Sequence, residues 1–207
     1  MKTIIYLCRH SEPIDMYDNK NETMQLRNEK ISLSVLGEEK ARKLSLLPEL
    51  NNIDNVIASN YVRAIATAKY IAFNNKKNIE VIPEFGERKF GINSWDELPD
   101  NFGEKQFLDE NYKTEFGESQ KEVRERTFNA LMNVLKNDEE KIAIVFHSTA
   151  MLFLIMTWCK VIPSKEDFSY KLLFNDEEVF NGKIDYCEIF KLTFDDENLI
   201  DIKNIRG

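Results

Sequence analysis

The 207-residue chain is poor in several residue types that mark particular protein classes. Only seven glycines and five prolines accompany a hydrophobic content of 43%, which argues against a disordered chain or a repeat array. The three cysteines (Cys8, Cys159 and Cys187) are odd in number and lack metal-ligand spacing. We therefore expect one globular domain over residues 1–207, with reduced thiols, a cytoplasmic location, and neither a metal nor a cofactor.

Long apolar runs and an excess of positive charge are also missing. The run 4–8 is too short for a signal peptide, and the run 150–159 is too short to cross a bilayer. The net charge of −8 disfavours nucleic-acid binding, which depends on Lys and Arg neutralising phosphates. The sequence thus predicts no membrane and no nucleic-acid partner, and it leaves the oligomeric state open.

Histidine occurs only twice, and each copy directly follows an apolar, strand-like run. His10 follows residues 4–9, and His147 follows residues 142–146. Such runs are typical of parallel strands buried on both faces, and open α/β sheets place reactive groups just beyond the carboxyl ends of these strands. We expect both imidazoles to reach one crevice.

Strand and helix patterns alternate along the chain, which predicts an α/β fold. Residues 11–31 are polar and predict a long loop, and residues 83–117 predict an irregular segment. Ser59 and Asn60 are expected to cap the second helix, with Arg63 in its first turn. The other predicted elements are strands at 55–58, 79–82 and 142–146, helices from 34 toward 48, from 119 to 136 and around 151–156, and a terminal hairpin over 184–205.

Two arginines, Arg9 and Arg63, are expected at strand ends beside the two histidines. Guanidinium groups match tetrahedral oxyanions bidentately, and a histidine can act as a nucleophile, so this set favours phosphoryl chemistry. Glu87 and Glu84 are the acidic candidates nearby. A Gly-rich phosphate loop ending in Lys-Ser or Lys-Thr is absent, and no cysteine is followed six residues later by arginine.

These segments resemble the histidine phosphatase superfamily, the phosphoglycerate-mutase-like group. The resemblance implies a three-layer α/β/α sandwich with a mostly parallel central sheet and a small lid insertion at 83–117. It also implies His10 as nucleophile, Arg9, Arg63 and His147 as phosphate clamp, and Glu87 as proton donor. The matching segments, in the family's order, are 7–12, 33–41, 58–68, 87–91, 117–126 and 145–148.

The residue that follows each histidine differs from the family's usual residue. Ser11 and Ser148 stand where the family has glycine, and both hydroxyls, with that of Ser59, are expected to bind substrate. Met16 replaces an asparagine that usually donates to phosphate.

The implied activity is a histidine acid-type phosphatase that hydrolyses a small phosphomonoester through a phosphohistidine, without metal. A cofactor-dependent phosphoglycerate mutase is the alternative, because residues 87–91 resemble the mutase segment; few basic residues follow Lys89, which argues against it. A non-catalytic phospholigand-binding module is a third possibility. Residues 93–116 carry seven acidic and two basic residues, so we expect the lid to disfavour anionic leaving groups.

Overall fold

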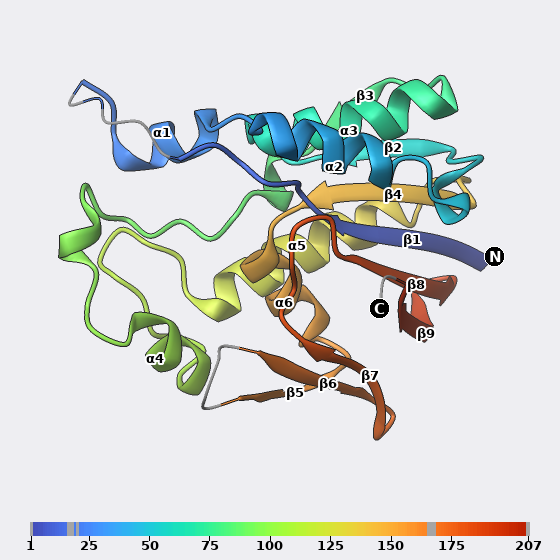
Figure 1. Cartoon of the computed structure of the whole chain (residues 1–207). Helices are drawn as coiled ribbons and strands as arrows, with labels where there is room; N and C mark the ends of the chain where they lie inside the picture. Colours follow the sequence, from blue (N-terminus) through green and yellow to red (C-terminus); the bar gives the residue numbers. More distant parts are fainter. Residues whose placement is uncertain (1, 16–18, 20, 165–168, 206–207) are drawn as a thin grey trace.

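The structure, a computed structural model, describes residues 2–15, 19, 21–164 and 169–205. Its centre is a six-stranded sheet in the order β3-β2-β4-β1-β8-β9 (Figure 1). Strands β1, β4, β2 and β3 run parallel to one another, whereas β8 pairs antiparallel with β1 and forms an antiparallel hairpin with β9 at one edge. The strand bounds are β1 Lys2–Arg9, β2 Asn55–Ala58, β3 Ile79–Val81, β4 Lys141–Phe146, β8 Ile189–Asp195 and β9 Asn198–Asn204.

Helices cover both faces of this sheet, which confirms the sandwich (Figure 1). Helices α2 (Val35–Leu44) and α3 (Val62–Asn75) lie on one face, and α5 (Gln120–Val134) and α6 (Ser148–Ile155) lie on the other. Alternate residues of β1 explain the two layers, because side chains of a strand point to opposite faces. Ile5 and Leu7 pack in the α5–α6 core, while Tyr6 and Cys8 pack in the α2–α3 core.

Local sequence signals set several helix starts. Ser34 caps α2 as expected, by accepting a hydrogen bond from the Gly37 N–H. Ser119 and Glu122 form the expected capping box at α5, an arrangement worth about 1 kcal/mol per cap. The prediction that Ser59 or Asn60 caps α3 is wrong: Tyr61 occupies the cap position without a side-chain hydrogen bond.

The prediction of a long loop over residues 11–31 is also wrong in part. A short helix, α1 (Met24–Lys30), begins there with Thr23 as its N-cap. Segment 83–117 likewise contains the helix α4 (Phe102–Leu108) and two 3₁₀ turns, Pro83–Phe85 and Trp95–Glu97. Helices α1 and α4 lie beyond the carboxyl end of β1 (Figure 1).

A second sheet precedes the terminal hairpin, and the sequence did not predict it. It is antiparallel, in the order β5-β6-β7, with bounds Lys160–Pro163, Tyr170–Phe174 and Glu177–Gly182. Only Leu172 among these strand residues is fully buried, so the strands carry no clear apolar alternation. Among the described residues, no helix is long and apolar enough to cross a membrane.

Candidate functional site

The first histidine follows strand β1, and its ring is held in one orientation. The His10 backbone N–H donates to the Phe146 carbonyl at 2.9 Å, and Nδ1 lies 2.7 Å from the Ser11 carbonyl oxygen. A carbonyl can only accept, so Nδ1 carries the proton and Nε2 keeps its lone pair. This is the tautomer in which Nε2 can act as a nucleophile.

Arg63 lies in the first turn of α3 and contacts both histidines. Its Nε donates to His10 Nε2 at 3.1 Å, and its Nη2 lies 3.3 Å from His147 Nδ1. Its Nη1 donates to the Asn28 carbonyl of α1 at 2.6 Å, which fixes the third side of the guanidinium. The side chain is only 6% exposed. Arg63 thus directs two donors at the space between the imidazoles.

His147 is the N-cap residue of α6, directly after β4, and is fully buried. Its ring centroid lies 5.1 Å from that of His10, so the two imidazoles are adjacent, as the sequence predicts. Its Nε2 lies 2.8 Å from Ser59 Oγ. Because a guanidinium only donates, Nδ1 accepts from Arg63, and the Nε2 proton points at Ser59.

Arg9, the last residue of β1, contacts the segment that follows β7. Its Nη1 donates to the Ile184 carbonyl at 2.5 Å, and its guanidinium carbon lies 4.2 Å from the ring centroid of Tyr186. The Tyr186 ring is also 5.8 Å from that of His10. Within the described part of the chain, Arg9 Nε is buried without a hydrogen-bond partner.

Burial sets the charge states in this cluster. It lowers the pKa of both histidines well below the usual value, and the Arg63 charge adds to this for His10. Burial also lowers the pKa of Arg9 and Arg63, although nearby negative groups, Glu87 included, oppose the shift. Because arginine stays protonated in proteins, the cluster combines two neutral imidazoles with two cations.

Glu87 lies against the start of α6. Its carboxylate accepts from the backbone N–H groups of Ala150 at 3.0 Å, Thr149 at 3.2 Å and Arg88 at 2.8 Å. The first two are free donors of a helix N-terminus, where negative charge is stabilised. One short helix therefore carries His147 at its cap and holds Glu87 in its first turn.

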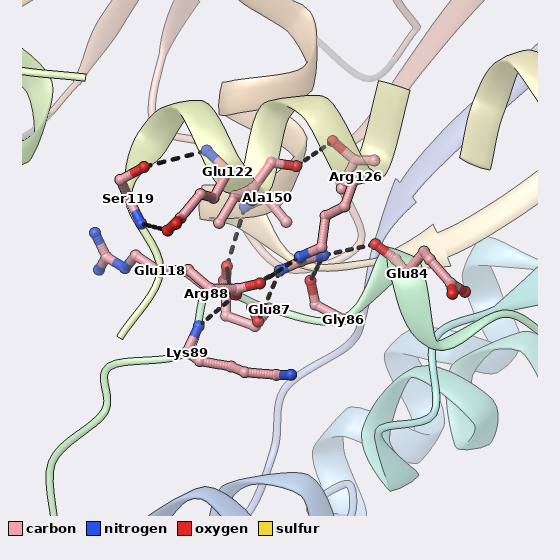
Figure 2. Close-up of polar contacts among 12 residues, drawn as sticks. Glu84, Gly86, Glu87, Arg88, Lys89, Glu118, Ser119, Glu122, Arg126 and Ala150 are labelled. Atoms are coloured by element: carbon pink, nitrogen blue, oxygen red, sulfur yellow. Dashed lines mark hydrogen bonds and ion pairs between the residues drawn. The ribbon is translucent and has the colours of Figure 1, made fainter. Parts of the chain in front are cut away.

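Arg126 of α5 holds the backbone that carries Glu87 (Figure 2). Its guanidinium donates to the carbonyls of Glu84 at 2.5 Å, Gly86 at 3.0 Å and Glu87 at 3.2 Å. It also forms a forked ion pair with Glu118, with contacts of 2.7 and 2.9 Å. Burial alone would raise the pKa of Glu118, but the bonds from Arg126 lower it. The sequence places Arg126 in a matching segment without indicating this role.

Other sequence-predicted residues occupy different environments. The Ser11 hydroxyl donates to the Gly37 carbonyl at 2.7 Å. Residue 37 has to be glycine for this close approach, because a Cβ there would lie 1.9 Å from the Glu12 carbonyl oxygen. Ser148 is the partly exposed first residue of α6. Substrate binding by Ser11, Ser59 and Ser148 stays a prediction. The Glu84 side chain points away from Glu87 in Figure 2, and Met16 lies outside the described residues.

The structure also adds neighbours that the sequence did not indicate. Tyr61 is buried with its ring centroid 4.4 Å from that of His147, and its hydroxyl accepts from Gln25 of α1 at 2.8 Å. Asn28 and Tyr186 contact the two clamp arginines. Gln25 and Asn28 belong to a segment without apolar periodicity. Tyr186 lies in the hairpin predicted over 184–205, whose first strand, β8, begins only at Ile189. Only the tertiary contacts reveal these three residues.

Two histidines and two arginines at the carboxyl end of a mostly parallel sheet define an α/β protein with a site suited to a tetrahedral anion. The chain belongs to the histidine phosphatase superfamily (branch 1), whose family model matches residues 5–198. None of the curated proteins matches it in sequence.

Solved structures share the whole fold at low sequence identity. A mycobacterial glucosyl-3-phosphoglycerate phosphatase is 15% identical with a TM-score of 0.70, over 99% of this chain and 98% of the other. A putative alpha-ribazole-5'-P phosphatase from Escherichia coli is 18% identical with a TM-score of 0.67, over 99% and 97%. A protein described as mycobacterial hydrolase 1 is 13% identical with a TM-score of 0.69, over the full length of both.

Proposed function

We propose that this protein is a metal-independent phosphatase that hydrolyses a small phosphomonoester through a phosphohistidine on His10. The observation that carries the proposal is the fixed tautomer of His10, with Nδ1–H directed at the Ser11 carbonyl and Nε2 facing Arg63. Superfamily membership supports the same reaction class. The three free, buried cysteines fit a reducing compartment, and we infer a cytoplasmic location.

In the first step, the phosphoryl group enters between the imidazoles and takes over the N–H groups that Arg63 directs at them. His10 Nε2 is then free to attack phosphorus in line, forming the N–P bond as the ester P–O bond breaks. Arg9 and Arg63 donate to the phosphoryl oxygens, and His147 joins them once its Nδ1, released by Arg63, takes the proton of the phosphate monoanion. The carboxyl group of Glu87 gives a proton to the leaving oxygen.

In the second step, Glu87 takes a proton from a water molecule that attacks phosphorus. The N–P bond breaks, phosphate leaves, and His10 returns to its starting form. The guanidinium groups supply the positive charge that stabilises the transferring phosphoryl group. A mutase would need further cations for a second phosphate and a carboxylate. Arg88 is engaged inside the 83–117 segment instead, because its guanidinium bonds Gln106 and lies 4.5 Å from the Phe90 ring centroid.

Turnover of p-nitrophenyl phosphate tests this proposal. Wild type is expected to hydrolyse it with or without EDTA. Arg9→Ala and Arg63→Ala are each expected to lower kcat by about 10²- to 10³-fold, the usual effect of losing one preorganised oxyanion donor. Lysine at either position is expected to rescue poorly, because it lacks the bidentate fork. Activity that disappears with EDTA and returns with Mg²⁺ or Zn²⁺ would contradict the mechanism.

A further inference from the structure

A small pocket of about 230 Å³ opens beside Arg9. Four parts of the chain form its walls: the end of β1, the N-terminal half of α6, the start of β6 and the segment that follows β7. We call it the Arg9 pocket. Its polar lining consists of Arg9, Ser148, Thr149, Tyr170, Lys183 and Asp185.

The Arg9 pocket adjoins both the clamp and the carboxylate of the candidate site. Arg9 forms one wall, and its bond to the Ile184 carbonyl ties that wall to another lining residue. Thr149 also lines the pocket, and its backbone N–H donates to the Glu87 carboxylate. In the mechanism above, the ester oxygen lies between the phosphoryl clamp and Glu87. The group attached to that oxygen therefore has the Arg9 pocket next to it.

The lining is rich in groups that both donate and accept hydrogen bonds. Ser148, Thr149 and Tyr170 each carry a hydroxyl, and burial raises the pKa of Tyr170, which keeps its phenol protonated. The Tyr170 ring is stacked with Phe107 of α4, at a centroid distance of 6.5 Å, so the 83–117 segment braces this wall.

Charge and size restrict the occupant further. Lys183 and Asp185 are both exposed at the pocket, and their opposite charges offset each other. The third charge of the lining, Arg9, is engaged by the phosphoryl group in the mechanism above. The Lys183–Asp185 pair then offers hydrogen bonds to neutral hydroxyls and no net attraction for a second phosphate. A volume of about 230 Å³ equals that of seven to eight water molecules at about 30 Å³ each, which is enough for one sugar ring.

We propose that the Arg9 pocket binds the leaving group, and that this group is an uncharged polyol such as a single sugar. The proposal rests on the phosphatase function and names its substrate class. It makes Tyr170 and Lys183 specificity residues, which contact the alcohol part of the ester and none of the phosphoryl oxygens.

The test compares glucose 6-phosphate, p-nitrophenyl phosphate and fructose 1,6-bisphosphate as substrates of the full chain. Tyr170→Phe and Lys183→Ala each remove one hydrogen-bonding group. Each is expected to lower the ratio of kcat/KM for glucose 6-phosphate to that for p-nitrophenyl phosphate by about fivefold, the worth of one net hydrogen bond. Tyr70→Phe, which changes a tyrosine on α3 that hydrogen-bonds Glu38, is the matched control and is expected to leave the ratio unchanged.

The outcomes separate this proposal from the one on which it rests. If wild type hydrolyses p-nitrophenyl phosphate but both variants keep its substrate ratio, or if the bisphosphate is the best of the three substrates, the pocket assignment is wrong and the phosphatase stands. If wild type hydrolyses none of the three, both proposals are wrong. Lys183 is exposed, so its variant tests the pocket even if Tyr170→Phe fails to fold.

Discussion

His10 and His147 are held neutral by burial, and this has a consequence for stability at acid pH. Their folded pKa values lie well below the value of about 6.5 expected in the unfolded chain. As pH falls below about 6.5, the unfolded state binds protons that the folded state does not bind. The stabilisation from the neutral imidazoles is therefore complete above that pH and is lost as pH falls toward the folded pKa values.

We expect the free energy of unfolding to fall with pH between about 6.5 and 5, with each histidine contributing up to about 1.4 kcal/mol per pH unit. Urea unfolding of wild type and His147→Gln across this range measures the slope. The variant is expected to have the smaller slope, whatever its absolute stability. Equal slopes would show that His147 has the same pKa in both states.

Ser59 is expected to act on phosphate only through His147, because its Oγ lies 2.8 Å from His147 Nε2. Ser59→Ala removes the acceptor of a buried N–H, which costs about 1 to 3 kcal/mol. We predict a loss of at least about fivefold in kcat/KM and a changed tautomer of His147 in nitrogen-15 NMR spectra. Ser45→Ala, which removes another buried hydroxyl, one bonded to the Arg42 carbonyl, is the control and should retain activity. An unchanged His147 spectrum in Ser59→Ala would rule out this role.

At the scale of elements, the turn that carries Glu87 depends on α5. Arg126 donates hydrogen bonds to three backbone carbonyls of that turn, so its loss is expected to let Glu87 move. A misplacement of about 1 Å can cost about 10²-fold in rate. We predict that Arg126→Gln lowers kcat by up to that factor for alkyl phosphates, whose leaving oxygen needs a proton.

The effect of Arg126→Gln is expected to be much smaller for p-nitrophenyl phosphate, whose leaving group departs without full protonation. Arg124→Gln is the matched control on the same helix, since Arg124 pairs with Glu110 and Gln120 and does not bond the turn. Equal losses on both kinds of ester would mean that Arg126 stabilises the fold without positioning Glu87.

Elements with strong local signals could be predicted, and those supported mainly by tertiary contacts could not. The buried strand 142–146 and the capping box at Ser119 are visible in the sequence and occur in the structure. Helix α1 has only Met24 and Asn28 buried, and its hydrogen bonds to distant residues include those with Tyr61, Arg63 and Asn93. No periodicity marks such a helix, because its stability comes from polar contacts with distant residues.

At the scale of the whole molecule, topology explains why the site was visible in the sequence. β1, β4 and β2 are adjacent and parallel, so the residues that follow them meet at one edge of the sheet. His10, His147 and Arg63 follow these three strands in turn. The hydrogen bonds that select each tautomer, and the pocket beside Arg9, depend on side-chain geometry. Segments such as 183–186 supply part of that geometry, and their sequence does not indicate it.

Which histidine carries the phosphoryl group is the most direct test of the account. Wild type, mixed with p-nitrophenyl phosphate and quenched during turnover, is expected to contain an acid-labile phosphate on the peptide that includes His10. His10→Ala is expected to stay folded, to form no such adduct and to lose turnover. Phosphate found on His147 and not on His10, or full turnover by His10→Ala, would contradict the account.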